Sequence, residues 1–102
     1  MSEKIIVTLF DRKAEYFLPI WLSDNDQTAK RQFVNLVKES DTLINKNPED
    51  FILFKVGKFD DKSGKVKEII HHVELANGLF LKNEKIDETL LEKYKPYRKE
   101  NE

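Results

Sequence analysis

Two adjacent histidines, His71 and His72, are the only imidazole side chains in the sequence and the first candidates for metal binding or acid–base chemistry. They fall within residues 65–75, where β-branched and apolar residues predict a strand. Neighbouring side chains on a strand point to opposite faces, so the two rings cannot bind one metal ion together. No serine, cysteine or further histidine stands at an evident spacing to complete a nucleophilic site. We therefore expect one half-buried ring and one exposed ring.

Two predicted turns partly match known phosphate- and calcium-binding motifs, but neither has the residues that its motif requires. Residues 57–66 have the wrong spacing for a phosphate loop, and Val66 replaces the required serine or threonine. Residues 60–64 fail as a calcium loop because Lys62 occupies a ligand position. The chain has no cysteine, which excludes disulfides and thiolate chemistry. We therefore expect a protein that is not an enzyme and that uses no metal or cofactor.

Several residues of the chain are suited to binding nucleic acid. Arg12 and Lys13 lie in a predicted turn, and Lys30 and Arg31 lie on a predicted helix. The four would form a positive patch if the turn and the helix share one side of the molecule. Tyr16, on a predicted strand, is suited to stacking on an unpaired base. These five residues are the candidate nucleic-acid-binding residues; the competing interpretation is an ordinary charge-mixed surface.

The aromatic residues on predicted strands allow two interpretations. Tyr16 and Phe54 are suited to be stacking platforms, but core or dimer contacts are the favoured interpretation, since aromatic side chains are usually buried. Residues 51–59 are apolar on both faces near their start, whereas one helix covers only one face of a sheet. A second cover is needed, and the candidates are a helix in the tail, a second subunit or a ligand.

Hydrophobic spacing predicts the elements of the N-terminal half. Residues 4–10 and 15–22 predict two strands, the second at a sheet edge or with a bulge because Pro19 cannot donate a ladder hydrogen bond. Short polar side chains at residues 23–26 then cap a helix predicted over residues 26–39. One or two further helical turns are expected over residues 41–47.

A second pair of strands follows. Residues 48–50 predict a turn into a central strand at 51–59, which a turn at 60–64 joins to the strand at 65–75. Asn77 and Gly78 signal another turn, and residues 79–81 predict a short fifth strand.

The expected class is α+β. It consists of an antiparallel sheet of four to five strands in the order β-β-α-β-β, with one helix packed on a face. Apolar residues at helical spacing predict a further helix over residues 84–95. The chain is therefore divided into an α+β domain at residues 1–82 and a C-terminal helix with a frayed tail at residues 83–102.

Composition limits the location and the mode of binding. The N-terminal apolar run is too short for a signal peptide, and no stretch approaches the roughly 20 apolar residues that cross a bilayer, so we expect a soluble protein. The net charge is −1, from 18 basic and 19 acidic residues. Nucleic-acid binding would thus depend on charge segregation, stacking or oligomerisation instead of a basic excess.

Several motifs occur in an order and spacing that together are fairly specific. They are Phe10-Asp11-Arg12-Lys13-Ala14, Tyr16-Phe17-Leu18-Pro19, Ala29-x-Arg31-x-Phe33, Asp41-Thr42, Pro48-Glu49-Asp50-Phe51, Leu53-Phe54, Gly57-Lys58-Phe59-Asp60 and Gly64. Over residues 8–64 the chain resembles the small nonstructural protein of gokushovirus-type microviruses (family Microviridae), the isometric single-stranded DNA bacteriophages. It departs from that family at residues 9–10, where Leu-Phe replaces a Val-Tyr or Ile-Tyr pair, and after Gly64.

The resemblance implies a nonstructural, DNA-binding accessory protein that acts in viral DNA replication or in the switch to single-stranded synthesis and packaging. It implies a location in the host cytoplasm, outside the virion, with single-stranded DNA as the expected partner and no membrane. We also expect a homodimer, because one sheet face would otherwise lack a cover. The alternative is a protein-interaction module that recruits or inhibits a phage or host replication or packaging protein without touching DNA.

Overall fold

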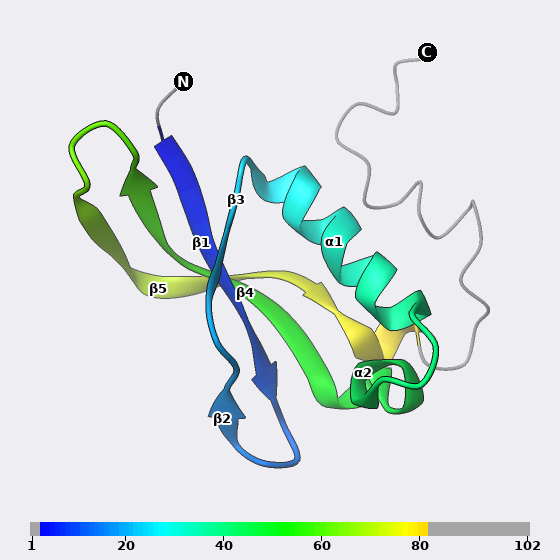
Figure 1. Ribbon diagram of the computed structural model, residues 1–102. Helices are drawn as coiled ribbons and strands as arrows, with labels where there is room; N and C mark the ends of the chain where they lie inside the picture. The colour runs from blue at the N-terminus through cyan, green and yellow to red at the C-terminus, as the bar shows by residue number, and fades with distance from the viewer. Residues whose placement is uncertain (1–2, 82–102) are drawn as a thin grey trace.

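An antiparallel sheet forms the centre of the molecule, and the computed structural model describes residues 3–81 (Figure 1). Strand β1 (Glu3–Asp11) pairs with β4 (Phe51–Asp60) from one end to the other. Strand β4 pairs in turn with β5 (Val66–Asn77). The residues predicted as a central strand therefore lie inside the sheet, between β1 and β5, as expected.

The predicted strand at residues 15–22 lies at the edge of the sheet but is divided in two. Strands β2 (Tyr16–Phe17) and β3 (Trp21–Ser23) both pair with β1. Pro19 lies in the break between them, where no hydrogen bond between strands requires a backbone N–H from it. With β2 and β3 the sheet has five antiparallel strands, so the expected α+β class is confirmed.

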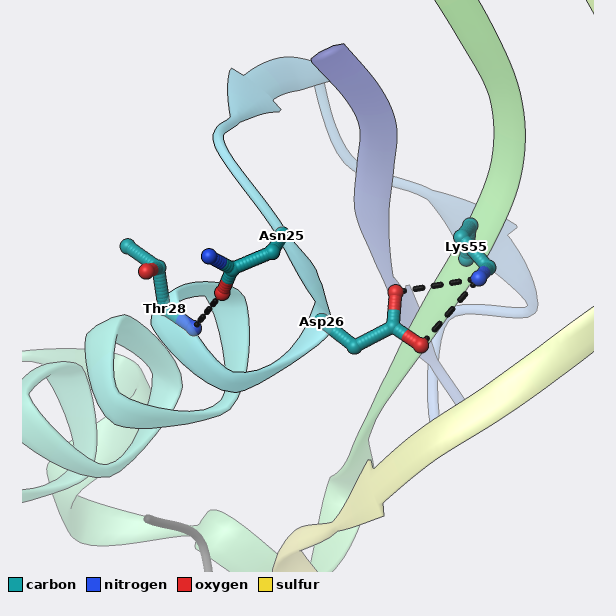
Figure 2. A network of polar contacts seen from close by, with 4 residues as sticks. All are labelled: Asn25, Asp26, Thr28 and Lys55. Carbon is teal, nitrogen blue, oxygen red and sulfur yellow. Dashed lines mark hydrogen bonds and ion pairs between the residues drawn. The ribbon is translucent and has the colours of Figure 1, made fainter. Parts of the chain in front are cut away.

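Helix α1 (Asp26–Lys38) crosses one face of this sheet. Its first turn is capped by Asn25, whose side-chain oxygen accepts the backbone N–H of Thr28 at 2.8 Å (Figure 2). The cap satisfies one of the amides that a helix start leaves without a partner. Asp26 then binds Lys55 of β4 at 3.0 Å, which ties the helix to the sheet.

The hydrophobic core lies between α1 and the sheet. Alternate residues of β1 and β4 point toward the helix, and every third or fourth residue of the helix points back, as the two periodicities require. The buried apolar residues of this layer are Ile5, Val7, Leu9, Ala29, Phe33, Val34, Val37, Phe51, Leu53, Ala76 and Leu81.

The pairing of β1, β4 and β5 is irregular at two levels, near Leu53–Phe54 of β4 and at Val56. Ile6 lies opposite Gly57 and Val7 lies opposite Lys55, so Val56 is an extra residue in β4. A side chain at Gly57 would bring a Cβ to within 2.8 Å of the backbone oxygen of Lys67, so only glycine fits there without displacing β5. The bulge bends the β4–β5 hairpin.

Short helical segments close the end of the core. Helix α2 (Leu43–Lys46) and the 3₁₀ helix η1 (Pro48–Asp50) precede β4, as the predicted helical turns and the turn at Pro48 require. Residues 78–81 form a second 3₁₀ helix, η2 (Gly78–Leu81), so the short fifth strand predicted at 79–81 is wrong. Close packing of η2 on η1 explains the difference, because a Cβ on Gly78 would lie 1.8 Å from the Pro48 oxygen.

The turn at residues 60–64 is formed as predicted. The backbone N–H of Gly64 donates to the oxygen of Asp60 at 2.7 Å, and Gly64 has a φ of 76°, a conformation that glycine adopts without strain. The helix predicted at residues 84–95 lies outside the described residues.

Candidate nucleic-acid interface

The face of the sheet opposite α1 carries a cluster of four aromatic rings from four different strands. The ring centroids of Phe10 on β1 and Phe17 on β2 are 4.9 Å apart. Phe54 of β4 lies 6.1 Å from Phe17, while His72 of β5 lies 5.9 Å from Phe17 and 6.4 Å from Phe54. These four residues are called the aromatic face below.

Strand alternation explains why these rings meet. Phe10 follows Leu9, and Phe54 follows Leu53; both leucines are buried beneath α1, so the phenylalanines point the other way. The β1–β2 register places Phe17 directly opposite Phe10. The rings are tilted or edge-on to one another, which are the favourable arrangements for aromatic pairs.

The aromatic face is open to solvent in the described part of the chain. Phe17 is 47% exposed and His72 is also exposed, whereas Phe10 and Phe54 are half-buried. An exposed ring supported by other rings can accept a stacked planar group without rearrangement. This is how sheet surfaces bind the bases of single-stranded nucleic acids.

Arg12 and Lys13 lie next to the aromatic face, in the turn that joins β1 to β2. The turn backbone is fixed: a carboxylate oxygen of Asp11 accepts the N–H groups of Lys13 at 3.0 Å and Ala14 at 3.1 Å. The N–H of Arg12 donates to the backbone oxygen of Asp50 at 2.7 Å. The side chains of Arg12 and Lys13 are exposed, so a fixed turn presents two cations beside the Phe10–Phe17 pair.

The structure separates the other two basic candidates from this turn. Lys30 and Arg31 lie in the second turn of α1, on the opposite layer of the molecule from the aromatic face. The helix begins beside the N-terminal half of β1, where Lys4 binds Asp24, whereas the turn follows the C-terminal end of β1. The single positive patch considered from the sequence is therefore not formed.

Tyr16 is well exposed but lies outside the aromatic cluster. It pairs with Asp11 at the edge of the sheet, and its ring is 57% exposed. Adjacent residues of β2 point to opposite faces, so Tyr16 lies on the α1 side while Phe17 joins the aromatic face. Phe54 is the stacking candidate from the sequence that the structure places on this face.

Sequence reasoning did not single out Phe10, Phe17 or His72 as binding residues. Strict alternation in residues 4–10 places Phe10 on the face opposite the core. The partner of Phe10 depends on the β1–β2 register, which the sequence alone did not provide. The histidine prediction was also wrong in part, because His71 and His72 are both exposed.

Two lysines near the start of α1 are already paired. Lys4 binds Asp24 at 2.6 Å, and Lys55 binds both carboxylate oxygens of Asp26, at 3.0 and 3.2 Å. The hydrogen bond and the charge of Lys4 lower the pKa of Asp24, and the same contact raises the pKa of Lys4. These cations are therefore less available to phosphates than Arg12 and Lys13.

Other kinds of site find little support in residues 3–81. In that range no group of three or more histidine, aspartate or glutamate side chains is placed to hold a metal ion. None of the helices described is long and apolar enough to span a membrane.

Comparison with known proteins supplies the family. The family model described as "Phage ORF5 protein" matches residues 4–81, which include all but the first residue of the described fold. Neither the curated proteins nor the solved structures contain a match. Because the family model covers most of the chain, this protein belongs to the phage ORF5 protein family and is a bacteriophage protein.

Proposed function

We propose that this phage protein is a nonstructural accessory protein of a gokushovirus-type microvirus that binds single-stranded DNA. In this proposal it acts in genome replication or in the switch to single-stranded synthesis and packaging, within the host cytoplasm and outside the virion. Membership of a phage family and the sequence resemblance described above support the viral setting.

The observation that carries the proposal is the open aromatic face. Phe17 is about half exposed at the centre of a ring cluster that includes Phe10, Phe54 and His72. Every base has an apolar π-face, so stacking on such a ring requires no particular sequence. A duplex keeps its bases stacked on one another, and the proposal therefore predicts a preference for single strands.

The charge distribution limits the electrostatic part of binding. Arg12 and Lys13 lie in the turn that follows Phe10 and β1, and the net charge of the protein is −1. If each contacts one phosphate of a single strand, log K falls with log salt with a slope of about −1.4. Stacking would then supply most of the affinity, and binding would persist at moderate salt.

The decisive experiment compares Phe17→Ala with the natural protein. Fluorescence anisotropy with labelled single-stranded and duplex oligonucleotides, at low and physiological salt, gives both affinity and strand preference. Loss of one stacked base is expected to weaken single-strand binding about 5- to 100-fold. Arg12→Glu combined with Lys13→Glu is expected to weaken binding and to flatten the salt dependence.

Two further variants control this experiment. Phe80→Ala removes an equally large exposed ring from η2, away from the cluster, and is expected to leave the affinity unchanged. Tyr16→Ala tests the α1 side of the same strand. Equal effects of Phe17→Ala and Phe80→Ala would contradict the aromatic face as the binding surface.

A protein-interaction module is the second candidate function, and a carboxylate beside the rings favours it. The register places Glu74 opposite Phe54, which puts an acidic residue next to the aromatic face. Phosphates avoid such a site, whereas a phage or host replication or packaging protein with a basic, apolar surface would fit it. Absence of oligonucleotide binding even at low salt, with a partner captured through Phe17, would favour this function.

A further inference from the structure

The outer edge of β5 is an unusual surface for a small domain. Strand β5 is 12 residues long, pairs with β4 on one side and forms the edge of the sheet on the other. Ile70 is 80% exposed near its middle, and Val66 and Val73 are exposed on either side. Long edge strands with apolar side chains are templates for pairing with another strand.

The middle of β5 is also poorly paired within its own sheet. The register passes directly from Gly57–Glu68 to Lys55–Val73, so residues 69–72 face the single residue Val56. Residues of an edge strand that direct their backbone N–H and C=O to the open side have no partner strand in the described sheet, and a second strand can pair with them there.

We propose that β5 pairs antiparallel with β5 of a second copy of this chain, about a twofold axis at Ile70. The two Ile70 side chains then lie opposite each other, with Glu68 opposite the partner's His72. A twofold axis perpendicular to the sheet keeps each side chain on its own face, so opposite residues must both be even-numbered or both be odd-numbered. Only registers centred on a residue satisfy this condition.

Charge favours a register centred on Ile70 over those centred on His71 and His72. Centring on Ile70 places Glu68 opposite His72 twice, once on each side of the axis. Centring on His71 places Glu68 opposite Glu74, and like charges directly opposite each other are unfavourable. A register centred on His72 places the two His72 rings opposite each other and Ile70 opposite a carboxylate.

The pairing extends the sheet without burying the aromatic face. Because the axis is perpendicular to the sheet, the two aromatic faces lie on the same side of the joined sheets. The dimer itself does not depend on DNA binding, since it rests on the edge of β5 alone.

The test is sedimentation equilibrium of the full chain without DNA, over a concentration series. The natural protein is expected to show reversible association to twice 12.1 kDa. Ile70→Lys places two positive charges across the axis and is expected to raise the dimer Kd at least about tenfold. Ile20→Lys, at a residue 62% exposed between β2 and β3, is the matched control and is expected to keep the natural Kd.

A charge exchange tests the register. His72→Glu places two carboxylates opposite each other on each side of the axis and is expected to weaken the dimer, whereas adding Glu68→Lys places a lysine opposite that glutamate and is expected to recover most of the affinity. Failure of the double variant to recover would overturn the register centred on Ile70.

A monomer at every concentration would overturn the dimer. Circular dichroism of each variant verifies that it is folded. Oligonucleotide binding by Ile70→Lys, measured separately, shows whether the proposed DNA site survives when the dimer does not.

Discussion

Asp24 and Asp26 are two carboxylates, two residues apart, that attach the start of α1 to different strands. Asp24 binds Lys4 of β1, and Asp26 binds Lys55 of β4. The first pair is exposed and contributes little stability, whereas Lys55 is largely buried and its pair is better shielded from solvent. Both pairs also occupy a lysine that a phosphate could otherwise contact.

The Lys4–Asp24 pair makes a prediction about pH. The folded pKa of Asp24 lies below its usual 3.8, so its contribution to stability is present above that value and is lost as the pH falls through the folded pKa. The folded pKa of Lys4 lies above its usual 10.5, so its contribution is present below that value and is lost as the pH rises through the folded pKa.

Asp24→Asn is therefore expected to lower the midpoint of urea unfolding slightly at neutral pH. The difference in midpoint between this variant and the natural protein is expected to shrink at both strongly acidic and strongly alkaline pH. Urea unfolding at a series of pH values measures this. Glu74→Gln, which removes an exposed carboxylate from β5, is the control. A difference between Asp24→Asn and the natural protein that stays constant from acid to alkaline pH would contradict a contribution from the ion pair.

At the scale of elements, the boundaries of α1 follow from local side-chain chemistry. Asn25 caps the first turn, Asp26 places a negative charge at the positive end of the helix, and Lys38 places a positive charge in the last turn. The N–H of Glu39 still bonds to the backbone oxygens of Asn35 and Leu36, after which the chain becomes extended. These signals explain why the predicted helix, residues 26–39, differs from α1 by one residue.

The cap of α1 can be tested with two asparagines of the same region. Asn25→Ala removes the acceptor for the Thr28 N–H and is expected to cost about 1 kcal/mol of unfolding free energy. Asn35→Ala, at an exposed position within α1, is expected to be neutral or slightly stabilising because alanine has the higher helix propensity. Urea denaturation followed by circular dichroism measures both. A cost for Asn25→Ala no larger than that for Asn35→Ala would contradict the role of the cap.

At the scale of the whole molecule, the fold depends on close contacts between distant segments. Gly78 of η2 packs against the Pro48 backbone of η1, and Leu81 at the end of η2 is buried in the core. The same contact turns the chain away from the sheet after β5. The end of the core is therefore closed by two 3₁₀ helices that lie 30 residues apart in the sequence.

Gly78→Ala is expected to lower the free energy of unfolding more than Gly64→Ala does. Its Cβ would overlap the Pro48 backbone, which must move, and the expected cost is about 3 kcal/mol or more. Gly64→Ala meets no atom within 4 Å and costs only the strain of a positive φ, about 1–2 kcal/mol. Thermal and urea unfolding compare the two. A milder effect at Gly78 than at Gly64 would contradict the packing of η2 on η1.

Much of the fold can be predicted because its signals are local. The strands at residues 4–10, 51–59 and 65–75 and the helix at 26–39 follow from hydrophobic spacing, capping residues and turn glycines, all of which act within a few residues. Pro19 likewise identified an edge strand, since a missing donor has the same consequence in any context. The α+β class follows from the order of these elements.

The tertiary structure decided what depends on register and on distant packing. The β1–β2 register brought Phe17 onto Phe10 and left Tyr16 on the other side, and the path of α1 separated Lys30 and Arg31 from Arg12 and Lys13. Packing against Pro48 made residues 78–81 a 3₁₀ helix instead of a strand. A sequence records which side chains are available, but pairing between strands and packing between layers determine which of them share a surface.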